Sequence, residues 1–424
     1  MVLPSRYKSD SIKTNLMQTL KKITLIVFTL LITSSYAQFK VDAEIRPRTE
    51  YRHGFKTLFP DGEKAALFTS QRTRLNVDYT TNKLNFYISF QDVRVWGDVP
   101  QLNSADNNGM SLHQAWGEIE LNSEYKLKLG RQELIYDDSR IFGNVGWAQQ
   151  ARSHDLAMFK YKKNAFRLDI GLAFNQSKEN LTGTNLTTPK TYKSLQYIWM
   201  HKDWQKFSGS LLFLNNGLQS TNGIKYSQTL GTHLKTKNTI VNVNANLYYQ
   251  FGNDVNNNKL SAYLIGLETN YKVSDNTTLG FGLELQSGND YNVSANKNNA
   301  FTPLYGTNHK FNGFMDYFYV GNHINNVGLL NFYAKANFKL NKRSNLIAFL
   351  HNFSAAANIN ATASKQLGNE LDLVYNYSLT KQINFKVGYS HLFASDSMKI
   401  LKGNFENTNN WAWVMITIKP KLLN

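Results

Sequence analysis

The chain has 424 residues and no cysteine, with 13% aromatic and 18% charged residues and 47 Lys and Arg against 30 Asp and Glu. The absence of cysteine excludes a disulfide framework, thiolate metal sites and a cysteine nucleophile. The formal net charge of +17 points to nucleic acid, a membrane surface or an acidic solute, and the length fits two or three soluble domains or one large barrel.

Residues 1–37 have the form of a secretory signal peptide. Lys21 and Lys22 precede the apolar run 23–32, and small residues follow it before Gln38. This core is shorter than the about 20 residues of a membrane-spanning helix. Met17 offers an alternative start, which would place residues 1–16 outside the translated chain. We expect a mature single domain, 38–424, with a net charge of +13, because the removed segment holds five Lys or Arg and one Asp.

From residue 39 onward, apolar and polar residues alternate with period two. In residues 39–46 the odd positions are apolar and all four even positions are charged. The alternation returns in segments 74–79, 84–90, 166–175, 239–251, 277–288, 328–340, 367–377 and 383–389. Such a pattern predicts β-strands with one apolar and one polar face. Apolar residues occupy both parities in 91–96, 111–116 and 411–418, so the pattern assigns no face there.

The connections between these strands alternate between short and long. The short ones lie at 80–83, 122–124, 162–164, 202–205, 237–238, 273–276, 341–343 and 379–381. The long, polar ones lie near 53–66, 97–110, 135–153, 177–190, 216–226, 252–259, 289–326, 355–365 and 394–408. Nine long and eight short connections join about 18 strands. This predicts an all-β, antiparallel transmembrane β-barrel with short periplasmic turns and long extracellular loops.

A membrane environment explains both the negative mean hydropathy and the aromatic content. Only alternate strand residues face lipid, and a sheet in lipid must close to satisfy its backbone. Aromatic residues expected in girdles at the membrane surfaces are Tyr79, Tyr125, Phe174, Trp199, Trp204, Phe251, Tyr271, Tyr377, Trp411 and Trp413. We therefore expect an integral protein of a bacterial outer membrane that contacts lipid and lipopolysaccharide and is inserted by the barrel-assembly machinery. The alternative is a soluble secreted β-helix or pair of sandwiches.

The polar faces of the first strands predict a positively charged channel. Arg46 and Arg48 on one strand and Arg72 and Arg74 on the next project to the same interior, where Glu44 lies among them. A barrel of this size leaves an aqueous channel, and rings of guanidinium groups select anions because they bind carboxylates and phosphates. The sequence predicts an arginine-rich lumen that passes anionic solutes. The alternative is a salt-bridge network that only stiffens the wall.

Three segments resemble the alginate-export family of outer-membrane porins. They are GRQELIYDDSRIFG at residues 130–143 with Trp147, Arg152 and Asp155 after it, FTPLYGTNHKFNGFMDYF at 301–318, and GYSHLF at 388–393. The similarity covers most of 38–424. It implies an 18-strand barrel with an electropositive constriction through which polyuronate leaves the cell.

The resemblance also implies roles for individual residues. The implied pore residues are Arg131, Arg140, Arg152 and Asp155, and the implied gating-loop residues are His309, Asp316 and Phe318. We expect a porin for anionic solutes, with polyuronate oligo- or polysaccharide export as the activity that the resemblance implies.

A barrel of this kind could have two functions other than that of a channel. A surface receptor or adhesin would bind its ligand through the long loops, above all 289–326. A barrel enzyme would need a Ser/His/Asp cluster at one rim, and the sequence shows none with recognisable spacing. The nine histidines are scattered and the basic residues are spread along the chain. We therefore expect no catalytic residues, metal ion or cofactor, and no nucleic-acid partner.

Overall fold

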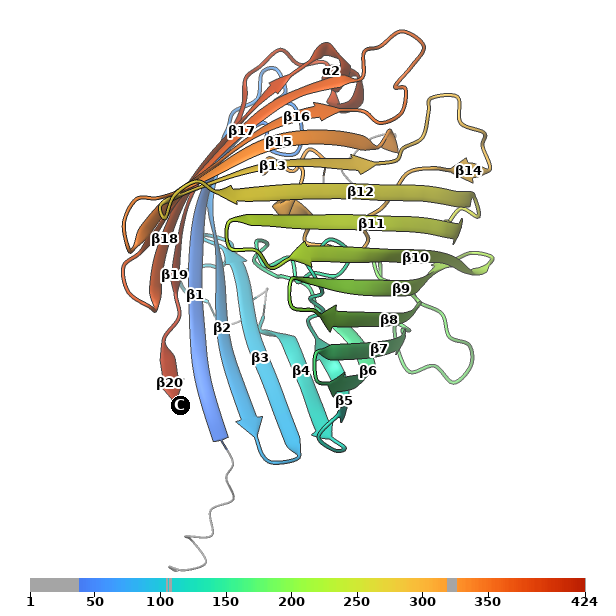
Figure 1. The fold of residues 1–424 in the computed structure, drawn as a ribbon, viewed down its shortest axis with the longest axis vertical. Coiled ribbons are helices and arrows are strands. Elements are labelled where there is room, and N and C mark those ends of the chain that lie inside the picture. The colour runs from blue at the N-terminus through green and yellow to red at the C-terminus, as the bar shows by residue number, and fades with distance from the viewer. Residues whose placement is uncertain (1–37, 104–105, 107–108, 319–325, 424) are drawn as a thin grey trace, which may run out of the picture.

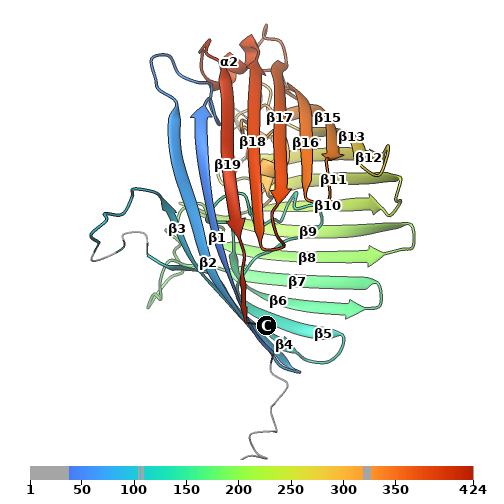
Figure 2. The same ribbon diagram turned by 90° about the vertical axis from the view of Figure 1, so that its left-hand side faces the viewer.

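The computed structural model describes residues 38–103, 106, 109–318 and 326–423, so the predicted signal peptide at 1–37 lies outside the described residues. Eighteen antiparallel strands form a closed ring, in which each strand pairs with the next and β19 pairs with β1 (Figure 1). Figure 2 shows β1 beside β19, where the ring closes.

The strands of the ring are β1 Gln38–His53, β2 Ala66–Thr80, β3 Leu84–Val95, β4 Ser111–Glu120, β5 Tyr125–Gln132, β6 His154–Lys163, β7 Phe166–Phe174, β8 Ser194–Asp203, β9 Phe207–Ser220, β10 Gly223–Thr236, β11 Val241–Asn253, β12 Lys259–Lys272, β13 Thr277–Gln286, β15 Leu329–Lys339, β16 Ser344–Ser354, β17 Gln366–Ser378, β18 Ile383–Ala394 and β19 Asn409–Ile418. Outside the ring, β14 (Lys297–Asn298) pairs with β12 and β20 (Lys421–Leu423) pairs with β1. The helical elements are η1 (Asn308–Lys310) and α2 (Asp396–Lys402). None of the helices in the described ranges is long and apolar enough to cross a membrane.

The predicted alternation of short and long connections is confirmed with one exception. All eight short turns join strands at one rim, where the described chain also begins and ends (Figure 1). At the opposite rim, the predicted long connection near 216–226 is wrong. Strands β9 and β10 continue to Ser220 and Gly223 and leave a two-residue turn. The polar side chains of this hairpin bond across the strands, as Gln228 does to Asn215 over 2.7 Å, so a sequence that reads as a loop extends the sheet.

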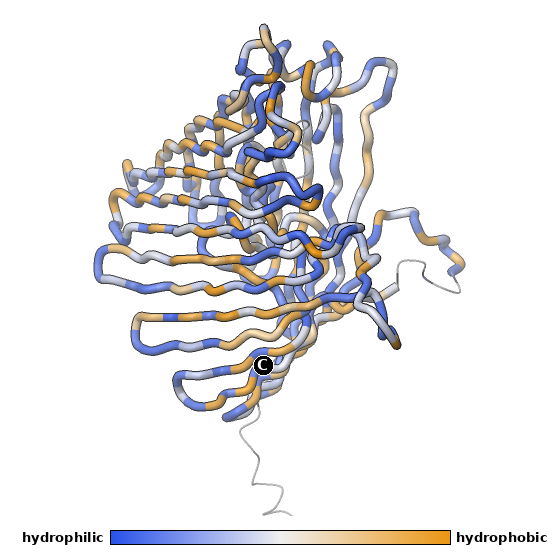
Figure 3. The backbone as a smooth tube through the Cα atoms, turned by 90° about the vertical axis from the view of Figure 1, so that its right-hand side faces the viewer, coloured by the Kyte–Doolittle hydropathy of each residue, from blue (hydrophilic) through white to orange (hydrophobic). Residues whose placement is uncertain are grey.

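The outer face of the barrel is apolar, as the period-two pattern predicts. Leu75, Leu172 and Phe281 expose 42%, 54% and 66% of their surface there, and hydropathy alternates along the strands in Figure 3. A register shift between Ser89 and Phe90 in the pairing of β3 with β4 breaks the parity, which explains the ambiguity at 111–116.

Much of the hydrophobic core lies inside the barrel, toward the rim with the long connections. Residues of two inward-folded loops pack there against inward side chains of the strands, for example Phe142 against Tyr197 and Phe318 against Phe353. The girdle prediction is wrong for Trp199, Trp411 and Trp413, which are buried in these interior clusters. The inward face of β19 is apolar because loops cover it, which explains the ambiguity at 411–418.

Candidate functional site

Described parts of two long connections, residues 133–153 and 301–318, fold into the barrel and narrow its interior. We name residues 133–153, between β5 and β6, the β5–β6 loop, and residues 287–328, between β13 and β15, the β13–β15 loop. Backbone hydrogen bonds join them: the N–H of Gly143 donates to the carbonyl of Tyr305 and that of Thr307 to the carbonyl of Ser139, each over 2.9 Å. The loops therefore meet inside the lumen and form one inner structure.

Arg46 holds the β5–β6 loop against the wall. Its guanidinium donates to the carbonyl of Gly146 over 2.7 Å, to those of Trp147 and Ala148 over 3.2 Å, and to Gln149 Oε1 over 2.9 and 3.1 Å. The side chain is 7% exposed. Arg46 thus projects inward, as the sequence predicts, but its donors are used by the loop and do not face open solution.

The neighbouring arginines have similar partners. Arg72 pairs with Glu44 and donates to the carbonyl of Gln149. Arg48 pairs with Glu50, donates to the carbonyl of Trp147 over 2.7 Å, and lies 4.0 Å from the centre of the Trp147 ring. Glu44 also pairs with Lys419 over 2.6 Å. This cluster secures the inner loop, which agrees with the wall-stiffening alternative for these arginines.

Arg74 differs from the other arginines of β1 and β2. Its Nε donates to Gln91 over 3.0 Å, and its Nη2 is buried without a hydrogen-bond partner in the described part of the chain. It pairs with no carboxylate within 4 Å there. Arg74 therefore adds positive charge to the inner wall that no direct ion pair compensates.

Arg140 and Arg152 connect the two inner loops. Arg140 is 1% exposed, and it donates to Glu284 on β13 over 2.6 Å and to Asn308 over 3.0 Å. Arg152 donates to the carbonyl of Gly306 over 3.1 Å. Both arginines lie inside the lumen, as expected of pore residues, and both hold the two loops together.

The prediction that Arg131 and Asp155 line the pore is wrong. They form an ion pair of 2.7 Å between β5 and β6 on the outer face. Their neighbours of opposite parity, Gln132 and His154, are the inward residues, and they are 0% and 3% exposed. Arg131 has the same parity as the exposed Leu129, so alternation along β5 indicates the outer face, and only the resemblance to the family motif placed Arg131 in the pore.

The predicted gating-loop residues lie together in the β13–β15 loop. The ring Nδ1 of His309 is 2.8 Å from Asp316 Oδ1, and the ring stacks on Trp147 with centroids 4.6 Å apart. Phe318 packs against Phe353 of β16. The pairing of His309 with Asp316 fixes the loop turn, and the stack on Trp147 joins it to the β5–β6 loop.

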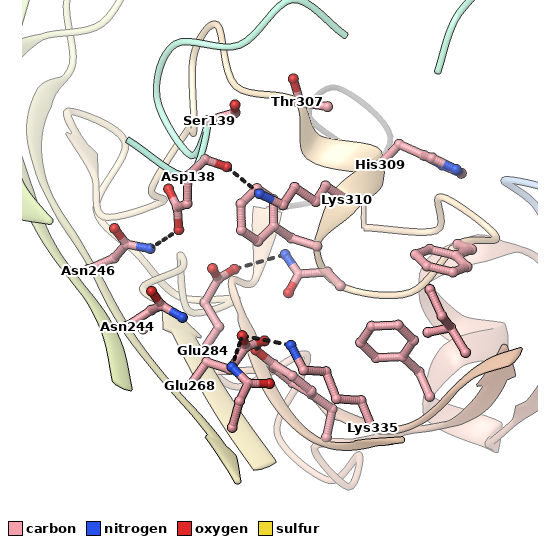
Figure 4. Close-up of a pocket in the computed structure, with 18 of the residues that line it drawn as sticks. Asp138, Ser139, Asn244, Asn246, Glu268, Glu284, Thr307, His309, Lys310 and Lys335 are labelled. Atoms are coloured by element: carbon pink, nitrogen blue, oxygen red, sulfur yellow. Dashed lines mark hydrogen bonds and ion pairs between the residues drawn. The ribbon is translucent and has the colours of Figure 1, made fainter. Parts of the chain in front are cut away.

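A cavity of about 1050 Å³ lies between the inner loops and the strands β8 to β19. Of the residues predicted for the site, only His309 lines it. One part of its wall is polar: Asn244 and Asn246 of β11, Glu268 of β12 and Lys335 of β15 surround this space in Figure 4.

The rest of the wall is apolar. Its side chains are Ile347 and Phe349 of β16, Val374 of β17, and Trp413 and Met415 of β19, with Trp147 and Phe314 from the loops. Lys386 of β18 lies among them, paired in register with Met415. The cavity is therefore amphipathic, which is unusual for an inner barrel wall that faces water.

Most acidic groups of the cavity have partners. Glu268 pairs with Lys335 over 2.7 Å, and Glu284 pairs with Arg140. Asp138 accepts from Asn246 over 2.6 Å, and burial raises the pKa of Asp137. In contrast, Lys386 and Lys235 make no ion pair within the described ranges.

Sequence reasoning missed this cavity. The alternation in 383–389 places Lys386 on the inward face, and that in 328–340 does the same for Lys335, so parity could have identified both. No local signal indicated that Trp147 and Phe314 would meet the wall, because their positions depend on the folding of two loops into the barrel. Among the described residues, no group of three or more His, Asp or Glu side chains is arranged to hold a metal ion.

Comparisons with known proteins agree with this architecture. The model of a family described as alginate export matches residues 37–409. Similar solved structures include OccAB1 of Acinetobacter baumannii (TM-score 0.64, 11% identity, 92% of this chain and 100% of that chain) and OccK11 of Pseudomonas aeruginosa (TM-score 0.61, 11% identity, 91% and 96%). A BenF-like porin from Pseudomonas fluorescens has a TM-score of 0.62 at 12% identity, with 91% and 99% covered. The comparison with curated proteins finds no match.

The family match spans most of the chain, and the similar structures are outer-membrane porins whose barrels align over nearly their full length. An 18-strand ring with an apolar outer face and a polar, loop-narrowed interior is the structure expected of such a channel. The chain is an integral outer-membrane β-barrel porin and belongs to the alginate export family.

Proposed function

We propose that this porin is a passive channel that favours anionic solutes. The observation that carries the proposal is the imbalance of paired charges inside the barrel. Glu268 and Glu284 are neutralised by direct ion pairs. Of the remaining charged groups in the lining, three lysines, Lys235, Lys310 and Lys386, make no ion pair among the described residues, against two carboxyl groups without a Lys or Arg partner, Asp137 and Asp138. Uncompensated charge of one sign in a narrow pore attracts the opposite ion.

The arginine cluster adds to this field although the inner loop covers it. All partners of Arg46 within the described chain are neutral, and its charge lies close to that of Lys386. Across the strands, Lys386 aligns with Met415 and Met415 with Arg48. Lys386 on β18 and Arg48 on β1 thus lie in one row on either side of Met415, and of these two charges Arg48 is paired with Glu50.

The channel explains the loop structure better than the receptor alternative does. A receptor or adhesin was predicted to present residues 289–326 outward. Residues 301–318 of that segment fold inward instead, where Met315 donates its N–H to Glu370 of β17 over 2.8 Å, whereas residues 291–297 are mostly exposed at the rim. We infer that the loop restricts passage, and that solutes enter without any reaction being catalysed. We also infer that lipid and lipopolysaccharide contact the outer face and that the barrel-assembly machinery inserts the chain.

The test is the reversal potential of the full-length mature porin in planar bilayers under a KCl gradient. We expect the sign of a chloride-preferring channel. Replacing both Lys235→Gln and Lys386→Gln should move this potential at least halfway to zero, while Lys342→Gln in the β15–β16 turn should leave it unchanged. A potassium-preferring wild-type channel would overturn the proposal. Polyuronate oligosaccharides added to one side test the family's export activity, which predicts interruptions of the current.

A further inference from the structure

One of the lysines without an ion pair in the described part of the chain, Lys386, lies in the apolar part of the cavity. Lys386 projects between β17 and β19, where Val374, Trp413 and Met415 line the same space. The nearby charges that act on it are those of Arg46 and Lys419, both positive. An ammonium group that is partly removed from water and has no counter-ion is poorly stabilised, and a bound carboxylate would correct this.

The shape of this wall fits a flat apolar group. Gly388 faces Trp413 across the strands, and the indole lies so close that a Cβ at residue 388 would come within 2.2 Å of the ring. Tyr333 covers Gly282 in the same way, at 2.2 Å. These glycines let the rings lie flat against the barrel wall, which keeps the space in front of them open. Phe349 continues the aromatic surface on β16, 6.3 Å from Tyr333 between ring centroids.

We propose that the cavity is a selective binding site for small monocarboxylates with an aromatic or otherwise apolar body. The carboxylate pairs with the Lys386 ammonium, and the apolar body lies on the surface made by Phe349, Trp413 and Met415. Burial of an apolar body releases water from this surface, whereas a hydroxylated solute of equal charge would lose hydrogen bonds to water there. The site rests on the proposed anion preference and narrows it from anions in general to one chemical class.

Polyhydroxylated uronates are the class against which this wall discriminates. Their hydroxyl groups need partners on every side. The wall at Val374, Trp413 and Met415 offers few, and the amides of Asn376 and Asn384 lie on the other side of Lys386, where they bond to each other. The amide groups that could serve a sugar, such as Asn244 and Asn246, lie on β11 in the polar part of the cavity. Specificity for one anion over another arises from such unsatisfied polar groups as much as from attraction.

The probe is benzoate, compared with glucuronate as a hydroxylated carboxylate of the same charge and with benzamide as a neutral analogue of the same shape. Binding to the purified, detergent-solubilised porin is measured by titration calorimetry. We expect glucuronate and benzamide each to bind at least tenfold more weakly than benzoate. Equal affinities for benzoate and glucuronate would overturn the proposal.

Two variants separate the charge from the apolar surface. Lys386→Gln should weaken benzoate binding at least tenfold, and Phe349→Asn, which keeps the charge of the site but removes part of its apolar surface, should weaken it at least fivefold. The matched control Lys342→Gln removes one positive charge at the periplasmic turn and should bind as the wild type does. Heat-modifiable gel mobility verifies that each barrel is folded. If Lys386→Gln binds benzoate as Lys342→Gln does, the assignment is wrong.

The same protein distinguishes the two proposals. A porin that prefers chloride to potassium but binds benzoate and glucuronate alike would refute the monocarboxylate site and leave the anion preference standing. A porin that prefers potassium would refute the proposed function, whatever its affinity for benzoate.

Discussion

Most arginines on the first two strands of this barrel hold the β5–β6 loop in place and do not face the solute. Arg46, Arg48 and Arg72 all project inward, as alternation along the chain predicts, but their hydrogen bonds go to Glu44, Glu50 and the backbone of the β5–β6 loop. A loop that folds into a barrel exposes carbonyl groups that need donors, and arginine supplies several from one side chain. Positive charge inside the pore is thus in part a consequence of holding the loop.

Replacing Arg46→Gln should release the β5–β6 loop without unfolding the barrel. Hydrogen bonds from a charged donor contribute about 1.5–3 kcal/mol each, and glutamine can keep some of the set, so a net loss of two should cost at least about 3 kcal/mol and open the loop at least ~100-fold more often. Limited proteolysis within 133–153 measures this, with Arg343→Gln in a short turn as the control. Cleavage at the wild-type rate would show that the loop does not depend on Arg46.

Lys402 in helix α2 gives a prediction about pH. Its Nζ has no hydrogen-bond partner in the described part of the chain, and burial lowers the pKa of Lys402 to about 8. An unfolded lysine titrates near ~10.4, so between these values the unfolded segment binds a proton that the folded one does not. The stability of this segment should therefore rise as the pH increases from about 8 to about 10. Below pH ~8 the segment bears the full free-energy cost of burying a charged lysine.

Lys402→Met removes this cost. At neutral pH the variant's segment 395–408 should resist subtilisin better than the wild type, and the difference should shrink as the pH approaches ~10. Lys342→Met, which changes a lysine in a short turn, should show no such effect. A pH-independent difference would mean that packing of the methionine, not the charge, is responsible.

At the scale of elements, the two inner loops act as one unit. Arg140 of the β5–β6 loop is buried between Glu284 on β13 and Asn308 in the β13–β15 loop, and backbone hydrogen bonds run between the loops beside it. On the far side, Glu370 accepts the N–H of Met315, and Gly313, at φ 83°, allows the loop backbone to approach that carboxylate. Each loop is thus fixed to the wall and to the other.

Arg140→Met should therefore loosen both loops. The change leaves Glu284 as a buried carboxylate without its cation, a situation that costs about 3–5 kcal/mol. Hydrogen exchange should increase at 133–153 and at 301–316, with the strands of the ring still protected. Faster exchange in the β5–β6 loop alone would contradict the coupling.

For the whole molecule, closure of the ring depends on pairing between its first and last strands. Thr49 on β1 lies opposite Val414 on β19. Because the chain has no cysteine, the pair Thr49→Cys and Val414→Cys can be introduced without competing thiols. Facing residues of antiparallel strands have Cα atoms about 4.5–5.5 Å apart, which suits a disulfide.

Oxidation should link these two cysteines in the folded porin and alter its gel mobility until a reductant is added. The control combines Thr49→Cys with Ile418→Cys, whose partner in the register is Ile45, and it should not cross-link. Efficient linking of the control, or none of the matched pair, would refute the closure register.

The sequence predicts the strands well, the roles of individual site residues less well, and the cavity not at all. Period-two alternation and the spacing of turns predict the strands, the apolar outer face and the two unlike rims. They fail at 216–226, where polar residues extend a hairpin. For Arg131 and Asp155 it is the family resemblance that is wrong, because both lie on the outer face, with the parity of the exposed Leu129 on β5. The family resemblance implies a pore role for Arg140 and a gating-loop role for His309 and Asp316. The structure places all three in the inner loops, where they hold the loops in position.

The sequence by itself determined that this is a closed outer-membrane barrel, because alternation along a strand is a local property and lipid permits only a closed sheet. Its net positive charge and lack of cysteine are likewise plain from the composition. Only the tertiary structure decided which charges face the solute. Two loops far apart in the chain fold into the lumen, and one of them binds Arg46, Arg48 and Arg72. They leave a cavity in which Lys386 lies beside apolar residues. No local pattern carries that information, because it depends on contacts between residues more than 100 positions apart, such as Arg46 and Gln149.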